Sequence, residues 1–308
     1  MDLNQQAQAF MTTIQTRKRN PASSNTVKTY QSLLKTWILP RLGSKDLKDV
    51  ENGALRAFVT SISGSLAPTS VSQACALVKA VVTSAVDANG NQLHPRTWNP
   101  DFIDAPVVRK TDLRAPVIGR EALQEALRRT QGQEQALYSL LAGTGLRIGE
   151  ALSLSTRPVS GSYWDARNRI IFVSSTLLLD SCQMQFHPKT EAGVREVDVY
   201  PALNEILCKI VRPESELVFT EHNRPLVYST VRRRLHGLGI AEAPHAFRRF
   251  RATYLESQRV PRALIKYWMG HANSDITEDY IKIGNDTTIR RQECERAGLG
   301  FELPGATQ

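Results

Sequence analysis

Hydrophobic residues recur at helical spacing through the first part of the chain. An apolar stripe within residues 30–37 predicts an amphipathic helix that begins near Ser24 and is ended by Pro40 and Gly43. Further helices are expected at 51–62 and from Pro68 to Ala85. Because no strand-like alternation occurs before about residue 165, this part of the chain is predicted to be a small helical bundle.

The second part of the chain mixes helical periodicity with short strand patterns. Helices are expected at 120–130, 134–142, 201–211, 226–238 and 286–297, and strands at 170–174, 183–187, 195–199 and 217–220. The fold class that follows is mainly α with a small antiparallel β-sheet. The last helix has few apolar residues, so we do not expect it to pack on its own domain.

Length and the change of pattern predict two domains. A chain of 308 residues can hold two ordinary domains, and a segment rich in proline and charge separates the two patterns. The predicted parts are a helical domain at 1–105, a linker at 106–116, a mixed α+β domain at 117–283 and a tail at 284–308.

Composition narrows the class of protein. The net charge of +9 favours a polyanionic partner, although many basic proteins bind nothing specific. The four cysteines are scattered without a C-x-x-C pair, which argues against a zinc site or a disulfide framework and fits a reducing compartment. No stretch approaches the roughly 20 apolar residues of a membrane span, and the N-terminus lacks a signal-peptide pattern. The protein is therefore predicted to be soluble and cytoplasmic.

The segment at 244–283 concentrates residues that can carry chemistry. His245 and Arg248 are three residues apart, so on a helix they share one face. His271 comes just after an expected helix end, and Tyr280 follows nine residues later. Two imidazoles, a guanidinium and a phenol, with no carboxylate evident among them, suit an anionic substrate.

Two upstream segments carry further candidates. Residues 143–149 hold glycines at G-x-G-x-x-x-G spacing, but no strand precedes them and no G-K-[ST] follows, so we reject a nucleotide-binding loop. Arg147 in this segment is by default a surface arginine at a helix start. Lys189 lies between the strands expected at 183–187 and 195–199, which places it at the tip of a β-hairpin, where a lysine is usually a solvated charge.

Together these segments resemble the signature of the tyrosine recombinases, also called phage integrases. H-A-F-R at 245–248 and M-G-H at 269–271, with Tyr280 beyond them, resemble the family's H-x-[LF]-R and [LM]-G-H boxes and its nucleophile. T-G-L-R-I-G-E at 144–150 resembles the first arginine box, T-G-x-R-x-x-E, and residues 189–195 resemble the lysine motif K-T-x-x-G-x-R. All the boxes occur in the family's order.

The resemblance implies a role for each candidate residue. The implied catalytic set is Arg147, Lys189, His245, Arg248, His271 and the nucleophile Tyr280, with Glu150 as the neighbour that holds a guanidinium in place. In this family the tyrosine forms a 3′-phosphotyrosyl ester with DNA, and the strand is rejoined without a metal ion, ATP or another cofactor.

The resemblance also implies partners. Residues 1–105 would form a core-binding, SAM-like domain that clamps double-stranded DNA at specific core sites, and the tail would dock on a neighbouring protomer. The expected assembly is a tetramer on DNA and a monomer or weak oligomer when free, associated with the nucleoid and with no membrane. Candidate DNA contacts are Arg17, Lys18, Arg19, Arg109, Lys110, Arg232, Arg233, Arg234, Arg249 and Arg251, with a solvated surface charge as the alternative.

Two other functions stay open on the sequence. A DNA-relaxing enzyme resembling type IB topoisomerases would use similar chemistry, but the short first domain and the M-G-H box favour a recombinase. A catalytically inert DNA-binding protein of the same fold is the other alternative, and the intact set of candidate residues argues against it.

Overall fold

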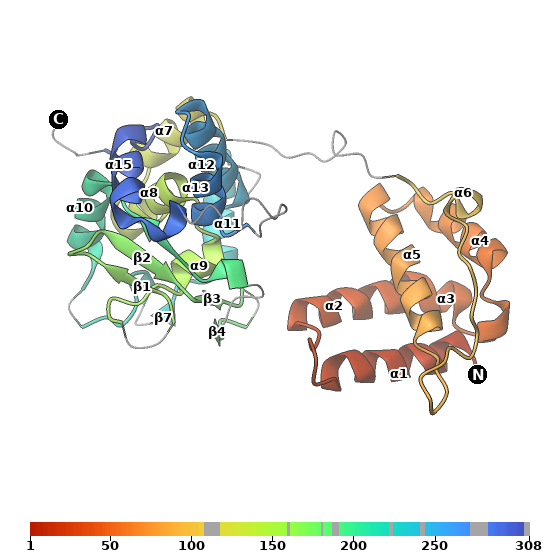
Figure 1. Ribbon diagram of the computed structural model, residues 1–308. Helices are drawn as coiled ribbons and strands as arrows, with labels where there is room; N and C mark the ends of the chain where they lie inside the picture. The colour runs from red at the N-terminus through yellow and green to blue at the C-terminus, as the bar shows by residue number, and fades with distance from the viewer. Residues whose placement is uncertain are drawn as a thin grey trace. The chain divides into compact units, whose positions relative to one another are not determined.

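Two hydrophobic cores form in the chain, one in each of two compact units, Met1–Arg114 and Ala115–Gln308 (Figure 1). The computed structural model describes residues 1–107, 118–158, 161–179, 181–186, 191–212, 214–221, 224–240, 244–271 and 283–304. Apart from its first two residues, the expected linker at 106–116 lies outside this described part of the chain.

The first unit is a helical bundle, as predicted. Its elements are α1 (Leu3–Thr16), α2 (Ser24–Leu33), the π-helix η1 (Leu34–Ile38), α3 (Leu39–Leu42), the 3₁₀ turn η2 (Leu47–Asp49), α4 (Asn52–Ser63), α5 (Pro68–Thr83) and α6 (Pro100–Ile103). Helix α5 packs against α1, α4 and η1, so it forms the centre of this core. The helices expected at 51–62 and 68–85 are present within two residues at each end.

Helix α1 was not predicted. The sequence analysis assigned no helix to residues 1–20, but α1 buries a narrow stripe made of Leu3, Ala7, Met11 and Ile14. Asp2 caps its first turn. A stripe about one residue wide leaves the segment polar on average, so its helical period is easily missed.

Pro40 does not end the helix in which it lies. Proline lacks an N–H group, and in an α-helix its ring would clash with the carbonyl four residues earlier. The chain instead widens into η1, where the N–H of Leu39 donates to the carbonyl oxygen of Leu34, and the helix continues to Leu42. Of the two predicted end signals, Pro40 is therefore wrong, whereas Gly43 does end the helix, as its C-cap.

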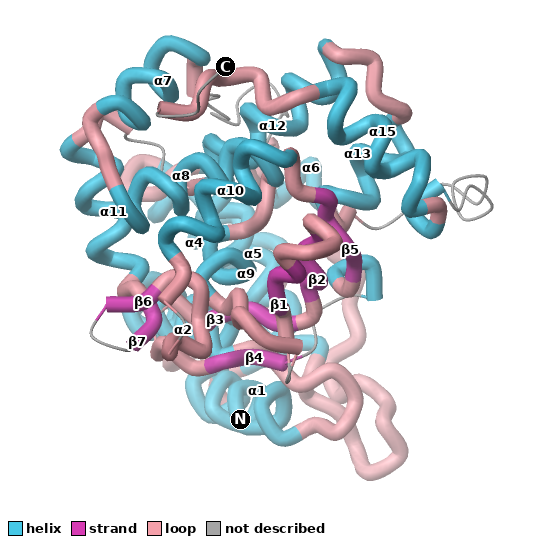
Figure 2. Tube along the Cα trace, turned by 90° about the vertical axis from the view of Figure 1, so that its left-hand side faces the viewer, coloured by secondary structure: helices cyan, strands magenta, loops and turns pink. Residues whose placement is uncertain are grey.

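The second unit is mixed α+β, as predicted. Its elements are α7 (Arg120–Arg128), α8 (Gly132–Thr144), α9 (Ile148–Leu152), β1 (Tyr163–Asp165), β2 (Ile170–Val173), β3 (Ser175–Leu177), β4 (Met184–Phe186), η4 (Glu191–Gly193), β5 (Arg195–Asp198), α10 (Pro201–Ile210), β6 (Thr220–Glu221), β7 (Arg224–Pro225), α11 (Tyr228–Gly237), α12 (His245–Ser257), α13 (Arg262–Met269), η5 (Ile283–Asn285) and α15 (Thr287–Ala297). Helix α8 is buried from Ala136 to Thr144 and contacts α7, α9, α10 and α12. Figures 1 and 2 show the strands at one end of this unit and α7 and α12 at the other.

In the described part of the chain the strands pair with one another antiparallel, in three small sheets ordered β1-β2-β5, β3-β4 and β6-β7. Trp164, Ile171 and Val197 lie side by side across the first sheet and are buried. The hairpin expected around Lys189 is a wrong prediction, because β4 pairs with β3 whereas β5 pairs with β2. Lys189 itself lies outside the described residues.

The described part of the C-terminal tail packs on its own unit. Helix α15 buries Arg290, Cys294 and Ala297, and Leu299 and Leu303 beyond it join the same core. This corrects the expectation that the last helix does not pack on its own domain, whereas docking of the tail on a neighbouring protomer stays a prediction. The low apolar content misled the prediction because one of the buried side chains is an arginine.

The two cores generate a prediction about unfolding. Leu55 is fully buried in the first core, and the two cores share no residue. Leu55→Ala should lower the stability of the first unit by about 2–5 kcal/mol through lost burial and a cavity. In calorimetry the first unit's transition should shift down while that of the second unit stays in place. Leu93→Ala, at a half-exposed side chain, is the control, and an equal shift of both transitions would contradict two separate cores.

Candidate active site

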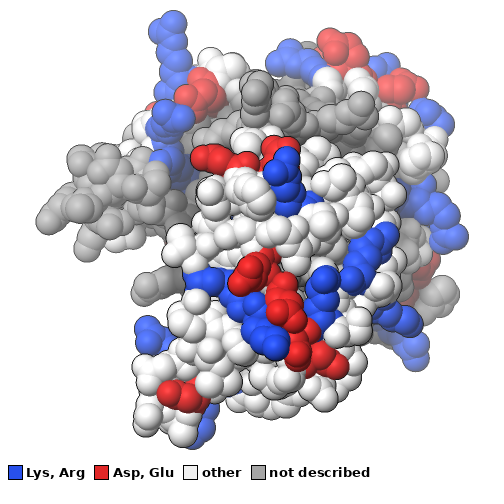
Figure 3. All heavy atoms as spheres, turned by 90° about the vertical axis from the view of Figure 1, so that its right-hand side faces the viewer, with Lys and Arg blue, Asp and Glu red and all other residues white. Residues whose placement is uncertain are grey.

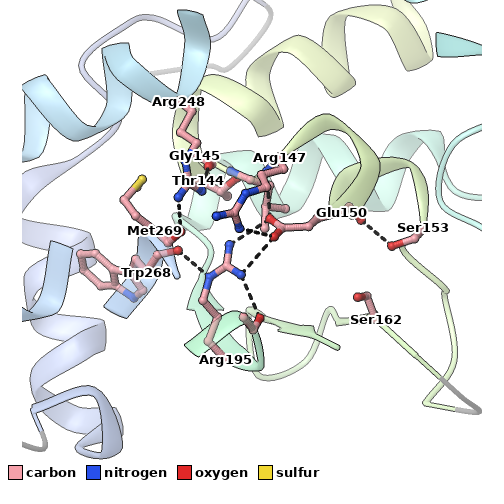
Figure 4. A network of polar contacts seen from close by, with 12 residues as sticks. Thr144, Gly145, Arg147, Glu150, Ser153, Ser162, Arg195, Arg248, Trp268 and Met269 are labelled. Atoms are coloured by element: carbon pink, nitrogen blue, oxygen red, sulfur yellow. Dashed lines mark hydrogen bonds and ion pairs between the residues drawn. The ribbon is translucent and has the colours of Figure 1, made fainter. Parts of the chain in front are cut away.

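A buried carboxylate lies at the centre of the predicted site. Glu150, with its side chain 6% exposed, accepts from Arg147 Nη1 at 2.8 Å. On its other side Arg195 donates through Nη1 at 3.2 Å and Nη2 at 2.9 Å, a two-pronged pairing (Figure 4). Arg147 remains 45% exposed, while the side chain of Arg195 is 1% exposed. The arrangement thus presents one guanidinium to solvent and keeps the other inside.

The motif at 144–150 is folded to give this geometry. Gly145 ends α8 with φ +72°, a left-handed backbone conformation that a side chain would strain. Arg147 then serves as the N-cap of α9, and its own N–H donates to Glu150 Oε2 at 2.9 Å. Helix α9 lies so close to β3 that a Cβ at Gly149 would lie 2.4 Å from Thr176 Oγ1. Backbone and side chain of Arg147 are therefore both fixed by Glu150.

Arg195 is a site residue to which the sequence analysis assigned no role. Its Nε donates to the carbonyl of Trp268 at 2.7 Å and its Nη1 to that of Gly193 at 3.1 Å. It therefore ties β5 to the end of α13 as well as to Glu150. The signal was present, because Arg195 is the last residue of the lysine motif K-T-x-x-G-x-R.

Arg248, on α12, extends its guanidinium to the backbone of Gly145 and Met269, next to the arginine box. It is 5% exposed, and its Nη1 donates to the carbonyl of Gly145 at 2.9 Å. Its Nη2 donates to the carbonyl of Met269. Burial, followed by the charge of Arg147, lowers the pKa of Arg248 to about 10, so this guanidinium keeps its charge at pH 7. Two carbonyls of the described residues thus hold this guanidinium in place.

Burial and the positive charges of Arg147 and Arg248 affect the pKa of both candidate histidines. Partial burial lowers the pKa of His245 and of His271, and the charges of Arg248 and Arg147 lower both further. Both imidazoles are therefore mainly neutral at pH 7. His245 lies at the start of α12, and His271 follows the end of α13, where its N–H donates to the carbonyl of Lys266 at 3.1 Å. The structure thus brings together the predicted His245, Arg248, Arg147 and His271.

The acidity of Glu150 reflects the same charges. Burial alone raises the pKa of this carboxyl, but the guanidinium groups of Arg195 and Arg147 outweigh it and hold the pKa below its usual range. Glu150 is therefore ionised throughout the neutral range.

Some of the predicted residues are not described. Lys189, Tyr280, Arg109 and Lys110 lie outside the described residues. Their roles stay predictions.

The predicted DNA contacts fall into distinct environments. The exposed ones are Arg17, Lys18, Arg19, Arg232, Arg233 and Arg234, and Arg249 is half-buried. Arg251 is a wrong prediction, because it is 3% exposed and its Nη1 donates to the carbonyl of Gly298 at 2.7 Å, inside the protein. On the face shown in Figure 3, the described Lys and Arg side chains are interspersed with Asp and Glu and do not form a single basic field.

The described residues contain neither a candidate metal-binding cluster nor a candidate membrane-spanning helix. Among those residues, no group of three or more His, Cys, Asp or Glu side chains is arranged to hold a metal ion. None of the described helices is both long enough and apolar enough to cross a bilayer.

The geometry at Glu150 predicts a large effect of its charge. Glu150→Gln keeps the shape but leaves two guanidinium groups without their partner, which should lower stability by about 3–5 kcal/mol at pH 7. A carboxyl with a lowered folded pKa stabilises above its unfolded pKa of about 4.3, and this is lost as pH falls through the folded value. The difference between wild type and variant in urea unfolding should therefore shrink in acid.

The matched control is Glu125→Gln. Glu125 also pairs with an arginine three residues away, Arg128, but both side chains are more than half exposed. Its loss should change stability by less than about 1 kcal/mol. An equally small effect at Glu150 would show that its pairing does not constrain the site.

Comparisons with known proteins identify the family of this chain. Residues 120–285 match the model of the phage integrase family. A candidate integrase/recombinase of Sinorhizobium fredii (strain NBRC 101917 / NGR234), y4gC, is 27% identical over 186 residues, which cover 56% of this chain and 84% of that protein.

Two solved structures share the fold. The Tn1549 transposon integrase in complex with transposon right end DNA matches with a TM-score of 0.69 at 20% identity, covering 95% of this chain and 98% of that chain. A lambda integrase tetramer bound to a Holliday junction matches with a TM-score of 0.58 at 15% identity, covering 91% and 76%. Because the family model spans more than half of the sequence, this chain belongs to the phage integrase family, the tyrosine recombinases.

Proposed function

We propose that the protein is a site-specific DNA recombinase that cuts and rejoins strands through a 3′-phosphotyrosyl intermediate. The observation that carries the proposal is the convergence of Arg147 and Arg248 with two neutral imidazoles, His245 and His271, at one place. Glu150 fixes one of these arginines from behind. Such a set suits a phosphodiester, whose charge grows on its non-bridging oxygens during displacement.

The two arginines would stabilise the transition state. A guanidinium presents a planar fork that can bond two phosphate oxygens at once. Arg248 is held by two carbonyls and Arg147 by Glu150, so neither needs to reorganise when charge develops. The neutral imidazoles can donate one hydrogen bond each and accept a proton at their other nitrogen.

The covalent step would be a balanced exchange of esters. The phenolic oxygen of Tyr280 forms a bond to phosphorus as the bond from phosphorus to the 5′-oxygen breaks. The phenol proton goes to an imidazole, and Lys189 gives a proton to the departing 5′-oxygen. The phosphotyrosine ester conserves the bond, so a 5′-hydroxyl can reverse the step and rejoin the strand.

The proposed partner is double-stranded DNA with specific core sites, bound by a tetramer. Support comes from family membership and from the fold shared with a lambda integrase tetramer bound to a Holliday junction. The first unit would act as the core-binding domain. Exposed cations such as Arg17, Lys18 and Arg19 on it would contact phosphates, so affinity should fall with salt.

The first test of the proposal is Tyr280→Phe on a nicked suicide substrate. The wild-type chain should form a covalent protein–DNA adduct visible on a denaturing gel, also in excess EDTA. Tyr280→Phe removes one oxygen, so DNA binding should persist while the adduct disappears.

Each other outcome has a clear meaning. No adduct with wild type would favour an inert DNA-binding protein, and adduct persisting in the variant would assign the nucleophile to another tyrosine. Relaxation of supercoils without a specific site would favour the topoisomerase-like alternative.

The second test concerns Lys189. A 5′-bridging sulfur leaves as a thiolate, whose conjugate acid has a pKa of about 8.5, so it needs little help from an acid. Lys189→Ala should cleave normal DNA at least about 10²-fold more slowly, and recover most of its rate on the bridging phosphorothiolate. Single-turnover cleavage rates on the two substrates measure this.

Arg248→Ala is the control for Lys189. Its partner oxygens are the same in both substrates, so its cleavage rate should be low on both. If Lys189→Ala also stays slow on the sulfur substrate, Lys189 is not the proton donor.

A further inference from the structure

Arg290 on α15 is a buried arginine that lies outside the proposed phosphate site. Its side chain is 2% exposed, and its Nε donates to Asp198 Oδ2 at 3.0 Å. Its Nη2 pairs with Glu196, and its guanidinium lies over the ring of Tyr267, 5.6 Å from the centroid. Replacing a buried ion pair by well-packed apolar residues often does not reduce stability. Stability alone therefore gives little reason for an arginine here.

Arg290 also contacts the hydroxyl of Tyr267 and the backbone of η5. Its Nη1 donates to the carbonyl of Gly284 at 2.5 Å. Gly284 also lies directly on Tyr267, where a Cβ would lie 2.4 Å from a ring carbon, so the backbone is pressed against the ring. Arg290 and Tyr267 thus hold this short turn from two sides.

This turn is close in sequence to the proposed nucleophile. Gly284 follows Tyr280 by four residues. Four residues of chain span at most about 14 Å, so a fixed Gly284 limits where the Cα of Tyr280 can go.

The chain that precedes Tyr280 is also held by residues of strand β5. On β5, Arg195 donates to the carbonyl of Trp268, just before His271. Three residues along β5, Asp198 accepts from the indole Nε1–H of Trp268 at 2.9 Å and from Arg290. Strand β5 therefore anchors the chain on both sides of Tyr280, through Arg195 before it and through Asp198 and Arg290 after it.

We propose that Arg290 is a positioning residue for the nucleophile: together with Asp198 and Tyr267 it fixes the chain just after Tyr280, so that the phenol is presented to the phosphate site of its own chain. The inference rests on the proposed function. It concerns only the delivery of the tyrosine and not the binding or activation of the phosphate.

Arg290, Asp198 and Tyr267, which hold the turn at Gly284, are called the anchor here. Two variants disturb the anchor in different ways. Gly284→Ala forces the turn off the Tyr267 ring without changing any charge. Arg290→Met combined with Asp198→Asn removes both members of the ion pair, so no buried charge is left alone. Their controls are Gly237→Ala, where a Cβ meets nothing within 4 Å, and Arg296→Met, an exposed arginine of α15.

Two assays separate the tyrosine from the phosphate site. The first is the rate of adduct formation on the nicked substrate, with DNA affinity and melting temperature measured alongside. The second places each variant in the Tyr280→Phe background and supplies hydrogen peroxide, a small nucleophile that can attack the phosphate in place of the phenol. Peroxide cleavage needs the phosphate site but not the anchor.

We expect both anchor variants to form adduct about 10²-fold more slowly, because a displacement near 1 Å can cost that much. DNA affinity and peroxide cleavage should stay within about twofold of the controls, and amide exchange at residues 283–286 should be faster. Equal loss of peroxide cleavage would make Arg290 a support of the phosphate site and overturn the inference, as would unchanged adduct formation. If the wild-type chain forms no adduct but retains DNA binding, the proposed function fails first and the inference fails with it.

Discussion

The carboxylate of Glu150 pairs with two arginines, the exposed Arg147 and the buried Arg195. The geometry of the candidate site depends on these two ion pairs. Arg195 donates to both of its oxygens from inside the protein, and Arg147 takes one of them from the solvent side. One negative charge thereby fixes α9, β5 and, through the carbonyl of Trp268, the end of α13. Without it, the buried guanidinium of Arg195 would lose its carboxylate partner beside the positive charge of Arg147.

The buried arginines of this unit show how surroundings decide the use of one side-chain type. Arg195 and Arg290 donate hydrogen bonds to acceptors within the protein. Arg195 lies on β5, and Arg290 pairs with Asp198 of the same strand. Arg248 instead donates to two backbone carbonyls, those of Gly145 and Met269, and among the described residues no carboxylate forms an ion pair with it. Arg147, by contrast, has 45% of its side chain exposed while it pairs with Glu150.

Apolar spacing and capping residues in the sequence correctly predicted several helices, because these features act between residues close in the chain. The helices at 51–62, 120–130 and 286–297 follow from apolar spacing and caps, and the arginine box at 144–150 was identified correctly as a helix start. Contacts between distant residues were beyond that reasoning, because Arg195 meets Glu150 45 positions away. The false hairpin around Lys189 has the same origin: neighbouring strands were assumed to pair, whereas pairing depended on which strand the core brought alongside. Arg251 was misassigned because its charge was visible in the sequence and its burial was not.

The separation of β4 and β5 into different sheets has a consequence for how this family member can vary. In a hairpin, adding one residue to the turn shifts the register and can turn side chains to the opposite face. Here β5 takes its register from β2 and β4 takes its register from β3. Insertions and deletions between Phe186 and Arg195 therefore leave the pairing of both strands intact. Related proteins can accordingly differ in the length of this connection while Arg195 keeps its place beside Glu150.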